Sequence, residues 1–595
     1  MREFSVPQTF SIPEDASMAD SVFRHAAEDP TFVPFKRPVD GAWVDVTAAE
    51  FAKQVSAVAK GLIASGIELG DRVAILSSTR YEWVVLDYAI WTAGGCTVAI
   101  YETSAPDQAS WILEDSATSV LVVEKPEHAT ALTEVTEAAP ALREVLQIEA
   151  GAIDTLVERG ASVTDEQLDE RRHQVRAESP ATLIYTSGTT GRPKGVQLTH
   201  SNFYAESAAV QLALGDSMYK GRRTLMFLPL AHVFARAVSF GAFDAKVTVA
   251  HTSDLTTLLD QFAAFQPNFI LSVPRVFEKV YNSAKQKAYD GGKGSIFEKA
   301  SATAIAWSEA QDTGGPGLGL KLKHALFDKL VYSKLRTALG GECDRAVSGG
   351  AALGARLGHF FRGIGVPVYE GYGLTETSAA ITVNTTNAQK VGTVGKPIDG
   401  HAAKIGEDGE LLLQGPVVFG GYWHNEEATA DAIRDGWFHT GDLGSIDEEG
   451  YVSITGRKKE IIVTAGGKNV APAVLEDALR AHPLVSQCLV VGDGKPFIGA
   501  IITLDAETLP GWKERNGIDA DTPVGSLLDH PELIAEIDAA VAEANTKVSN
   551  PEQIKKYKVI DSDFTIETGE LTPTLKLKRN IIHKERGAII ESIYV

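Results

Sequence analysis

Cysteine is scarce in this chain of 595 residues. The three cysteines, Cys96, Cys343 and Cys488, are odd in number and far apart, so the sequence offers neither a disulfide framework nor a zinc-binding cluster. This usage suits a reducing compartment, and we expect a cytoplasmic protein.

Long apolar runs are also missing. The first residues, MREFSVPQTFSIPED, contain no apolar stretch of the kind found in secretory signals. The most apolar segment, residues 83–101, is interrupted by Asp87, Gly94 and Gly95, so it predicts a buried helix, a turn and a strand. A spanning helix needs about 20 uninterrupted apolar residues. Any contact with a membrane is therefore predicted to be peripheral, at its inner face.

Positive charge is in short supply, because 56 Lys and Arg face 78 Asp and Glu and the formal net charge is −22. Nucleic-acid binding needs basic faces, so we expect no nucleic-acid partner. The exception is the segment 275–336, which looks helical and holds eleven Lys or Arg against six Asp or Glu, a net charge of +5. We favour a solvated helical face there; a patch facing phosphates or an anionic membrane is the alternative.

The chain does contain an alternation of β-rich runs and helical patterns. Strands are expected at residues 72–77, 97–100, 119–123, 181–185, 246–250 and 269–272. The pattern predicts an α/β fold whose large domain, residues 1–456, has mostly parallel sheets flanked by helices and a small β-barrel-like part. A small mobile α+β domain is expected at residues 457–595. Parallel sheets bind ligands at the carboxyl ends of their strands, where we searched for motifs.

The segment YTSGTTGRPKG, residues 185–195, directly follows one of these strands. Glycines allow backbone N–H groups to approach an anion closely, while hydroxyls and a lysine add further donors. It is not a Walker loop, since Pro193 stands where the second glycine belongs. The loop predicts phosphate binding through Thr186, Ser187, Gly188, Thr189, Thr190, Gly191 and Lys194.

This loop resembles the signature of the adenylate-forming superfamily, which includes acyl-CoA synthetases, firefly luciferase and peptide-synthetase adenylation domains. Further motifs of that family follow in order along nearly the whole chain. The segment LPLAHVFAR, residues 228–236, resembles the second motif, which implies that His232 lies near the acyl carboxylate and the α-phosphate. The segments SGGA, residues 348–351, and YEGYGLTET, residues 369–377, resemble the adenine-pocket motifs. The resemblance assigns nucleotide binding to Gly349, Gly350, Ala351, Glu370, Gly371, Tyr372 and Gly373, a phosphate contact to Thr375, and Mg²⁺ to Glu376 with Thr186.

Three later segments also resemble family motifs. GWFHTGD, residues 436–442, resembles the ribose-binding motif, with Asp442 accepting hydrogen bonds from the ribose hydroxyls. GRKKE, residues 456–460, resembles the interdomain hinge, which assigns Arg457 to the ribose and places Lys459 at the hinge within reach of the nucleotide. TAGGKN, residues 464–469, resembles the loop that lines the pantetheine tunnel, with Gly466 and Gly467 beside the thiol arm.

The carboxyl-terminal segment GELTPTLKLKR, residues 569–579, departs from the family pattern T-x-S-G-K-x-x-R by having Thr574 for Ser and Leu575 for Gly. Aligned with that pattern, Lys576 is the catalytic lysine and Arg579 the trailing arginine, with Lys578 as a rival. The form LTPTLKLKR resembles long-chain synthetases, as does the segment 272–280 with the helical region after it.

The resemblance therefore implies a long-chain fatty acyl-CoA synthetase of bacterial type, with Lys576, His232, Thr375 and Glu376 as its catalytic set. Its substrates would be a fatty acid, ATP with Mg²⁺, and coenzyme A, and its intermediate an acyl-AMP. The alternatives are a fatty acyl-AMP ligase that loads a carrier protein, an aryl or short-chain CoA ligase, a kinase and a non-catalytic nucleotide or acyl binder. The sequence leaves the oligomeric state open.

Overall fold

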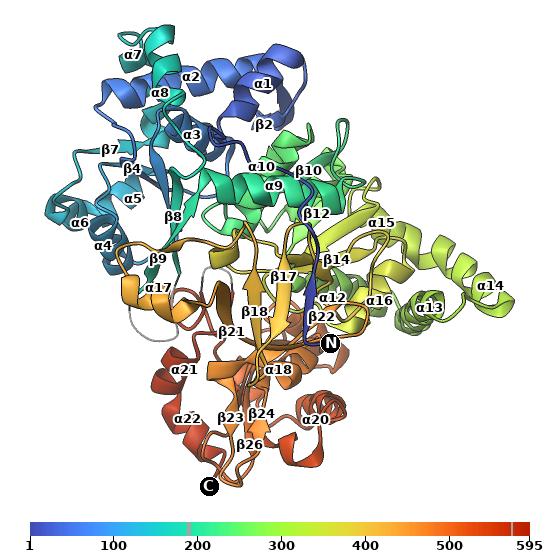
Figure 1. The fold of residues 1–595 in the computed structure, drawn as a ribbon. Helices are drawn as coiled ribbons and strands as arrows, with labels where there is room; N and C mark the ends of the chain where they lie inside the picture. Colours follow the sequence, from blue (N-terminus) through green and yellow to red (C-terminus); the bar gives the residue numbers. More distant parts are fainter. Residues whose placement is uncertain (187–191, 573–574) are drawn as a thin grey trace.

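The computed structural model of the protein describes residues 1–186, 192–572 and 575–595. The fold is α/β, as predicted. Figure 1 shows a large part, coloured blue to light orange, above a smaller orange-to-red part that ends the chain. The apolar clusters of the large part end by Val452 and those of the small part begin at Ile462, and they share no residue. We therefore propose that the two domains are residues 1–456 and 457–595.

The first sheet of the large part carries the predicted phosphate loop. Its central strands are parallel, and two antiparallel strands close one edge. The order is β19 (Gly421–Tyr422), β9 (Lys194–Thr199), β8 (Pro180–Thr186), β5 (Cys96–Ile100), β4 (Arg72–Leu76), β6 (Val120–Val123) and β7 (Glu144–Gln147). Helices α1 (Asp20–Glu28), α2 (Ala48–Ala64), α3 (Tyr81–Thr92), α4 (Pro106–Asp115), α5 (Pro126–Ala131), α6 (Thr133–Ala138), α7 (Ala152–Gly160), α8 (Asp165–Arg172) and α9 (His200–Leu214) accompany this region.

The apolar segment at residues 83–101 forms a helix, a turn and a strand, as predicted. Every residue of α3 except Glu82 is buried, and β5 is buried throughout. The one charge in the middle of α3, Asp87, is paired with the buried guanidinium of Arg236, whose Nε donates to it at 2.7 Å. Buried charges need such partners, so this pair explains how α3 tolerates an aspartate.

A second and a third sheet complete the α/β region. The second has the order β10 (Arg223–Met226), β11 (Thr248–His251), β2 (Phe35–Val39) and β3 (Ala42–Val46). The third has the order β12 (Phe269–Ser272), β13 (Arg345–Ser348), β14 (Val368–Tyr372), β15 (Thr382–Val383) and β16 (Lys396–Pro397). The strand predicted at residues 246–250 begins two residues later, because Lys246 has a φ of +58° and turns the chain after α10 (Val233–Asp244).

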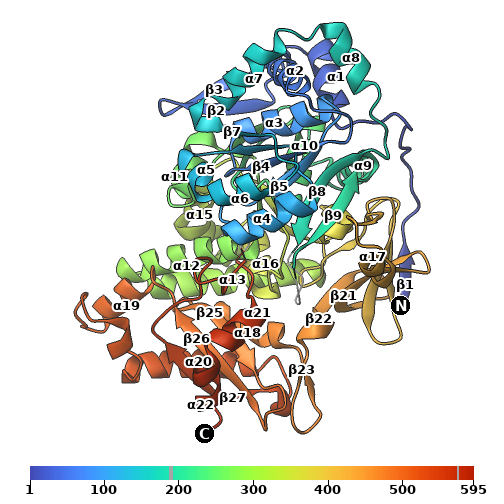
Figure 2. The same ribbon diagram turned by 90° about the vertical axis from the view of Figure 1, so that its left-hand side faces the viewer.

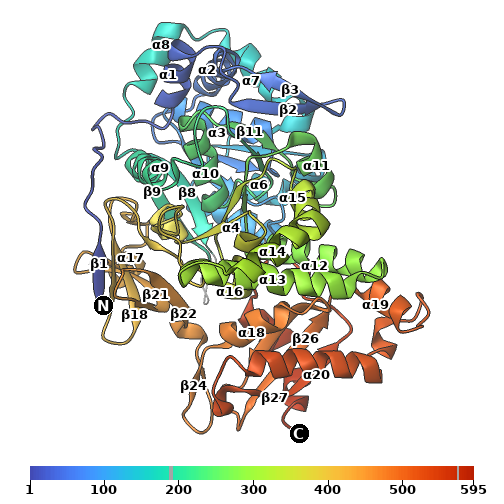
Figure 3. The ribbon, with the colours of Figure 1, turned by 90° about the vertical axis from the view of Figure 1, so that its right-hand side faces the viewer.

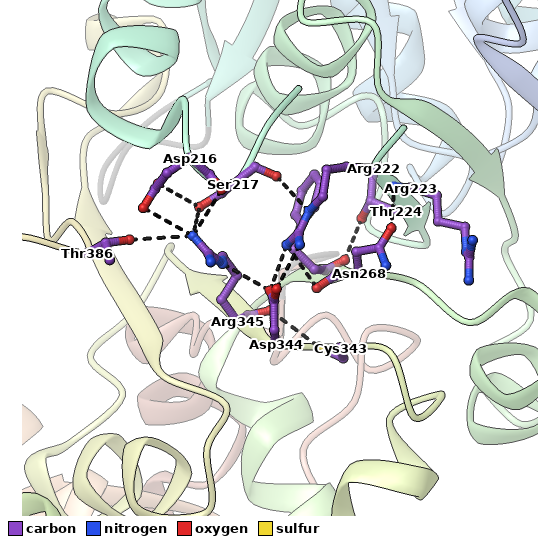
Figure 4. Close-up of polar contacts among 11 residues, drawn as sticks. Asp216, Ser217, Arg222, Arg223, Thr224, Asn268, Cys343, Asp344, Arg345 and Thr386 are labelled. Atoms are coloured by element: carbon purple, nitrogen blue, oxygen red, sulfur yellow. Dashed lines mark hydrogen bonds and ion pairs between the residues drawn. The ribbon is translucent and has the colours of Figure 1, made fainter. Parts of the chain in front are cut away.

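A polar network joins the second and third sheets at the amino ends of their strands. Arg222 donates two hydrogen bonds to Asp344, at 2.7 and 2.6 Å, and Arg345 pairs with Asp216 at 3.2 Å (Figure 4). Arg222 directly precedes β10, and Asp344 and Arg345 stand just before and at the start of β13, while Asp216 closely follows α9. The charges therefore fasten the two sheets to each other at the edge opposite the predicted ligand-binding ends.

An antiparallel sheet extends the large part, in the place of the expected β-barrel-like portion, and its strands follow an open path. The order is β1 (Glu3–Ser5), β17 (Ala402–Ile405), β18 (Glu410–Gln414), β21 (Trp437–Ile446) and β20 (Ile433–Arg434), with β22 (Val452–Arg457) beside β21. The helix α17 (Glu426–Ala432) precedes β20. The strand β22 leads directly out of this sheet into the small part.

The small part is α+β, as predicted. A hairpin of β23 (Ile462–Val463) and β24 (Asn469–Val470) precedes a sheet of β25 (Val485–Val491), β26 (Ile498–Leu504) and β27 (Ile554–Ile560). Both β25 and β26 are buried throughout, so helices cover the sheet on both faces. These helices are α18 (Pro472–Arg480), α19 (Leu509–Arg515), α20 (Pro531–Asn545), α21 (Arg579–Glu585) and α22 (Gly587–Ser592).

The basic segment 275–336 is helical, as predicted, and some of its charges fasten the small part to the large part. On α12 (Pro274–Asp290), Arg275 pairs with Asp505 at 3.1 Å and Lys279 with Glu507 at 2.7 Å. The rest of the segment comprises α13 (Gly294–Asp312), α14 (Leu318–Phe327), a π-helical turn (Asp328–Tyr332) and α15 (Ser333–Ala338). Within the described ranges, no helix has both the length and the apolar character that crossing a bilayer requires.

Candidate active site

The predicted phosphate loop starts and ends on neighbouring strands. Thr186 ends β8 and faces Lys194, the first residue of β9, across the strand pair. The predicted residues Ser187, Gly188, Thr189, Thr190 and Gly191 lie outside the described residues. The Nζ of Lys194 lies 5.1 Å from the ring centroid of Tyr422, within cation–π range. The loop's lysine is thus held at the carboxyl end of the sheet, where ligands of such sheets bind.

Tyr422 also connects this lysine with the predicted Mg²⁺ ligand. Its hydroxyl donates to Oε1 of Glu376 at 2.8 Å. Burial raises the pKa of the Glu376 carboxyl, and the hydrogen bond from Tyr422 acts against that rise. A partly desolvated carboxylate is stabilised by a cation, so the position suits a metal or a cationic side chain. Sequence reasoning missed Tyr422, because it lies outside every recognised motif and a lone tyrosine carries no local sign of function.

The oxygen donors present suit Mg²⁺. This ion prefers hard oxygen ligands and is usually held by one or two carboxylates together with substrate phosphates. Glu376 supplies a carboxylate, and its turn packs against β9, whose first residue is paired with Thr186, a hydroxyl donor. Among the described residues, no group of three or more His, Cys, Asp or Glu forms a protein-only cage for a metal.

The first adenine-pocket motif forms a loop after β13 whose glycines are required by space and by backbone shape. A Cβ on Gly349 would come within 2.9 Å of the Phe234 ring, and Gly350 has a φ of +83°. The N–H of Leu353 donates to Oε1 of Glu370 at 2.9 Å, and this hydrogen bond ties the loop to β14. Glu370 is buried, and burial, followed by the charge of Asp477, raises its pKa to about 7.

The second motif continues from β14 into a tight turn that carries Thr375 and Glu376. A Cβ on Gly373 would lie 1.4 Å from the carbonyl oxygen of Ala379, and one on Gly371 would lie 3.2 Å from that of Thr382. The backbone therefore crosses itself at Gly373, and no other residue fits there. Ala351 lies in the loop after β13, two residues before Leu353.

The two residues assigned to the ribose, Asp442 and Arg457, contact each other and lie beside Tyr372 of the adenine-pocket motif. Asp442, only 3% exposed, accepts hydrogen bonds from the Tyr372 hydroxyl at 2.5 Å and from Nε of Arg457 at 2.8 Å. An ionised carboxylate has about four acceptor positions, so Asp442 can accept hydrogen bonds from ribose hydroxyls beside these two described contacts. Tyr372 comes from β14, Asp442 from β21 and Arg457 from the end of β22, which brings the adenine motif and the ribose motif into one place.

His232 caps the helix α10 beside the same site. Its Nδ1 accepts a hydrogen bond from the N–H of Phe234 at 3.2 Å. Burial, and then the positive charge of Lys576, lower the pKa of His232 to about 3. The imidazole is therefore neutral near pH 7, and because Nδ1 is the acceptor, Nε2 carries the hydrogen. It can donate this hydrogen to an oxygen of a bound anion.

Lys576 of the small part reaches this site. Crowding by protein atoms, and then the charge of Arg457, lower the pKa of its amine, while Asp442, Glu460 and Glu376 oppose that shift. The side chain keeps an exposed surface. Lys576 thus lies in the electrostatic range of residues from three predicted motifs, all of them more than a hundred residues away along the chain.

The turn that carries Lys576 supports its alignment with the family lysine. Its N–H donates to Oγ1 of Thr572 at 3.0 Å, and the N–H of Thr572 donates to the carbonyl of Lys576 at 2.8 Å. Leu575 has a φ of +60°, the left-handed conformation that glycine adopts most easily. The family pattern has glycine at this position, and Leu575 adopts a conformation that suits glycine. Thr574 lies outside the described residues.

Arg579 and the rival lysine occupy different surroundings. Arg579 pairs with Glu476 at 2.8 and 2.5 Å and with Glu460 at 3.2 Å, so it fixes the carboxyl-terminal segment to the hinge. Lys578 precedes α21 and its N–H donates to the carbonyl of Glu570 at 2.8 Å.

Two predicted groups are not brought into the site. Gly466 and Gly467 are exposed at the tip of the β23–β24 hairpin, which points away from the large part in all three ribbon views (Figures 1, 2 and 3). Lys459 is exposed on the hinge turn after β22, and its neighbour Lys458 pairs with Asp408 at 2.5 Å. Among the described residues, those of the predicted adenylation motifs therefore lie in one place, apart from Lys459, while the predicted tunnel loop lies outside it.

Comparison with family models shows which family the chain belongs to. The model of the AMP-binding enzyme family matches residues 22–423, and that of the AMP-binding enzyme C-terminal domain matches residues 459–595. The chain belongs to the AMP-binding enzyme family.

Two individual relatives are long-chain-fatty-acid–CoA ligases. The chain is 57% identical, over the full length of both chains, to the long-chain-fatty-acid–CoA ligase FadD15 of Mycobacterium bovis. It is 32% identical to the long-chain-fatty-acid–CoA ligase ACSBG2 of Gallus gallus, over 93% of this chain and 78% of that one.

Solved structures share the fold at low sequence identity. An anthranilate CoA ligase, AuaEII, in complex with anthranoyl-AMP aligns with a TM-score of 0.73 at 20% identity, over 98% of this chain and 99% of that one. A Mycobacterium tuberculosis fatty acyl CoA synthetase aligns with a TM-score of 0.62 at 22% identity, over 96% and 99%.

Proposed function

We propose that the protein is a long-chain fatty-acid–CoA ligase, which joins a long-chain fatty acid to coenzyme A and converts ATP to AMP and pyrophosphate. The observation that carries the proposal is the position of Lys576. It comes from the small part, and its charge acts on His232 at the carboxyl edge of the large part. A protein that only bound a nucleotide would have no use for a lysine delivered from a second domain.

In the first half-reaction the fatty carboxylate attacks the α-phosphorus of ATP, and pyrophosphate leaves. Both reactants are anions, so catalysis depends on positioning and on positive charge. Lys576 lies between the carboxylate and the α-phosphate and stabilises the charge that builds up there. The neutral His232 donates from Nε2 to the same group of oxygens. Lys194 and the hydroxyls of residues 186–190 hold the pyrophosphate end.

The nucleoside is held by the remaining residues. The adenine lies against the glycines of residues 349–350 and the ring of Tyr372, while Asp442 and Arg457 hold the ribose. Glu376 and Thr186 hold Mg²⁺, which neutralises phosphate charge when it is bound. Thr375 contacts a phosphate from the same turn as Glu376.

In the second half-reaction the thiol of coenzyme A attacks the acyl carbon of acyl-AMP and AMP leaves. The tunnel loop around Gly466 must then replace the turn of Lys576, so we propose that the small part rotates about the hinge near Lys459. Domain closure of this kind is common in enzymes. We place the reaction in the cytoplasm, where ATP and coenzyme A are found and where the buried free cysteines stay reduced.

Product analysis with a panel of fatty acids of increasing length tests the proposal. We expect AMP and pyrophosphate with long-chain acids, and acyl-CoA when coenzyme A is added. Release of ADP would indicate a kinase, and the absence of any nucleotide product would indicate a binder. Acyl-AMP that reacts with a carrier protein and not with coenzyme A would indicate the carrier-loading alternative. A maximum with aromatic or very short acids would contradict the chain-length assignment.

A matched pair of variants tests the lysine. Lys576→Ala should slow acyl-AMP formation about 10²- to 10³-fold while sparing thioester formation from supplied acyl-AMP, because the lysine acts only in the first half-reaction. Lys578→Ala, two residues away, should leave both half-reactions near the wild-type rate. The reverse result would assign catalysis to Lys578, and an equal loss in both half-reactions of Lys576→Ala would contradict the two-state assignment.

A further inference from the structure

Four leucines form an exposed stripe on α14 and the π-helical turn that follows it. Leu318 is 81% exposed, Leu322 73%, Leu326 56% and Leu330 47%. They recur every fourth residue, so they follow one side of the helix. Single exposed leucines are common, but an exposed run of this kind marks a surface that contacts something apolar.

The opposite side of the helix is already occupied. The ring of His324 stacks on Trp307 with 4.1 Å between centroids, and its Nε2 lies 2.6 Å from the carbonyl oxygen of Gly363. The buried Tyr332 donates from its hydroxyl to the carbonyl of Ala300 at 2.7 Å. The helix therefore cannot turn its leucines inward without breaking these contacts. Figure 1 shows α14 at the right-hand edge of the large part, pointing away from it.

Lysines flank the stripe. Between residues 313 and 338 there are five Lys or Arg and one acidic residue, a net charge of +4 in a chain whose net charge is −22. The single acidic residue, Asp328, is paired with Arg336 at 2.7 Å. The four lysines are exposed and form no ion pair with any residue that the structure describes: Lys321, Lys323, Lys329 and Lys334.

We propose that the leucine stripe, Leu318, Leu322, Leu326 and Leu330 with these four lysines, docks the protein on a lipid surface that carries anionic headgroups. Helices that lie in a membrane interface combine an apolar face with Lys or Arg beside it. With ten residues, α14 is about 15 Å long, half the thickness of the hydrocarbon layer, so it lies on the surface and does not span it. The lysines meet the negative headgroups while the leucines enter the boundary with the acyl chains.

The charges favour a lipid over a second copy of the chain. If two copies packed stripe to stripe, the lysines on both helices would face each other, and like charges at short distance are unfavourable. An anionic surface instead pairs with all four lysines at once. The proposal rests on this surface alone, so binding can be measured without ATP and separately from the ligase activity.

Cosedimentation with vesicles of phosphatidylcholine, with and without phosphatidylglycerol, tests the proposal on the full-length protein. We expect binding to the anionic vesicles that weakens at high salt. Replacing Leu318, Leu322 and Leu326 together by Ser should weaken binding by about tenfold per leucine. Replacing Lys321 and Lys323 by Ser should weaken it by about fivefold per lysine, at low salt only.

The matched control is Leu212→Ser, which removes a leucine that is 58% exposed on α9 and lies outside the stripe. It should bind vesicles as the wild type does. Near-ultraviolet circular dichroism and AMP release should be unchanged in all variants, which separates lost docking from misfolding and from failure of the proposed activity.

Three results would overturn the proposal. The first is a wild type that does not bind anionic vesicles. The second is a triple leucine variant that binds as tightly as the wild type, or a control that loses as much binding as the triple variant does. The third is a wild type that sediments as a dimer without vesicles and becomes a monomer in the triple variant, which would identify a second copy as the occupant.

Discussion

The buried carboxyl of Glu370 should make the stability of the large part depend on pH. Its pKa is raised to about 7 from an ordinary value of 4.5, because burial disfavours its charged form and Asp477 of the small part adds a like charge. Between these two pH values the folded protein holds a proton that the unfolded chain has released. The free energy of unfolding therefore falls as pH rises from about 4.5 to 7, and the loss is complete above that range.

The difference of about 2.5 pH units corresponds to about 3 kcal/mol. Glu370→Gln cannot ionise, yet its amide oxygen can still accept the hydrogen bond from Leu353. At pH 5 the variant should unfold at nearly the same urea concentration as the wild type. At pH 8 it should be more stable by up to about 3 kcal/mol. Tryptophan fluorescence reports the transition, since the chain has eight tryptophans.

Asn202→Ala is the matched control. Asn202 is also a buried side chain whose oxygen accepts a backbone hydrogen bond, from Thr199 at 3.0 Å, but its amide does not ionise. Its substitution should change stability by the same amount at both pH values. If Glu370→Gln changed the free energy of unfolding equally at pH 5 and pH 8, the assignment of a titrating carboxyl next to the loop after β13 would be refuted.

Three further predictions concern the site and the core. Gly373→Ala should abolish nucleotide binding in a calorimetric titration, because the added Cβ would overlap the carbonyl of Ala379. Asp87→Ala should destabilise the large part by about 3–5 kcal/mol in urea unfolding, because it leaves the Arg236 guanidinium buried without its partner; a change below 1 kcal/mol would contradict this. The rate of acyl-AMP formation should fall as the pH rises and Lys576 loses its proton. Because the pKa of Lys576 is lowered, this fall should occur at a lower pH than for a free lysine. Lys576→Arg should move the fall to higher pH.

The sequence predicted well those features that depend on local pattern. Alternating apolar runs and helical periodicity placed most strands within a residue or two, because strands buried on both faces read as continuous apolar segments. The order of the motifs identified the family and supplied the predictions for the residues of the site. The sequence also predicted the importance of the glycines in the two adenine-pocket motifs, because a close approach of the backbone leaves few other residues possible.

Features that depend on contacts between distant parts of the chain could not be predicted from the sequence. The hydrogen bond between Tyr422 and Glu376 joins a motif residue to one that lies outside all the motifs, and neither local sequence indicates it. The leucines of α14 illustrate the same limit. Apolar residues at a spacing of four normally indicate the buried side of a helix. In α14 the buried side of the helix instead carries His324, whose ring stacks on Trp307, and the leucines are exposed.

The contacts between the two parts suit a domain that must leave its position. The apolar clusters do not cross the boundary, and the pairs Arg275–Asp505 and Lys279–Glu507 are partly exposed. Exposed ion pairs contribute about 0–1 kcal/mol each, so breaking them is a small barrier to rotation. In contrast, Arg579 is bound to Glu460 at the hinge and to Glu476, which lies within the small part. The turn of Lys576 should therefore move as one body with the hinge turn and the small part, which is what the exchange of Lys576 for the loop around Gly466 requires.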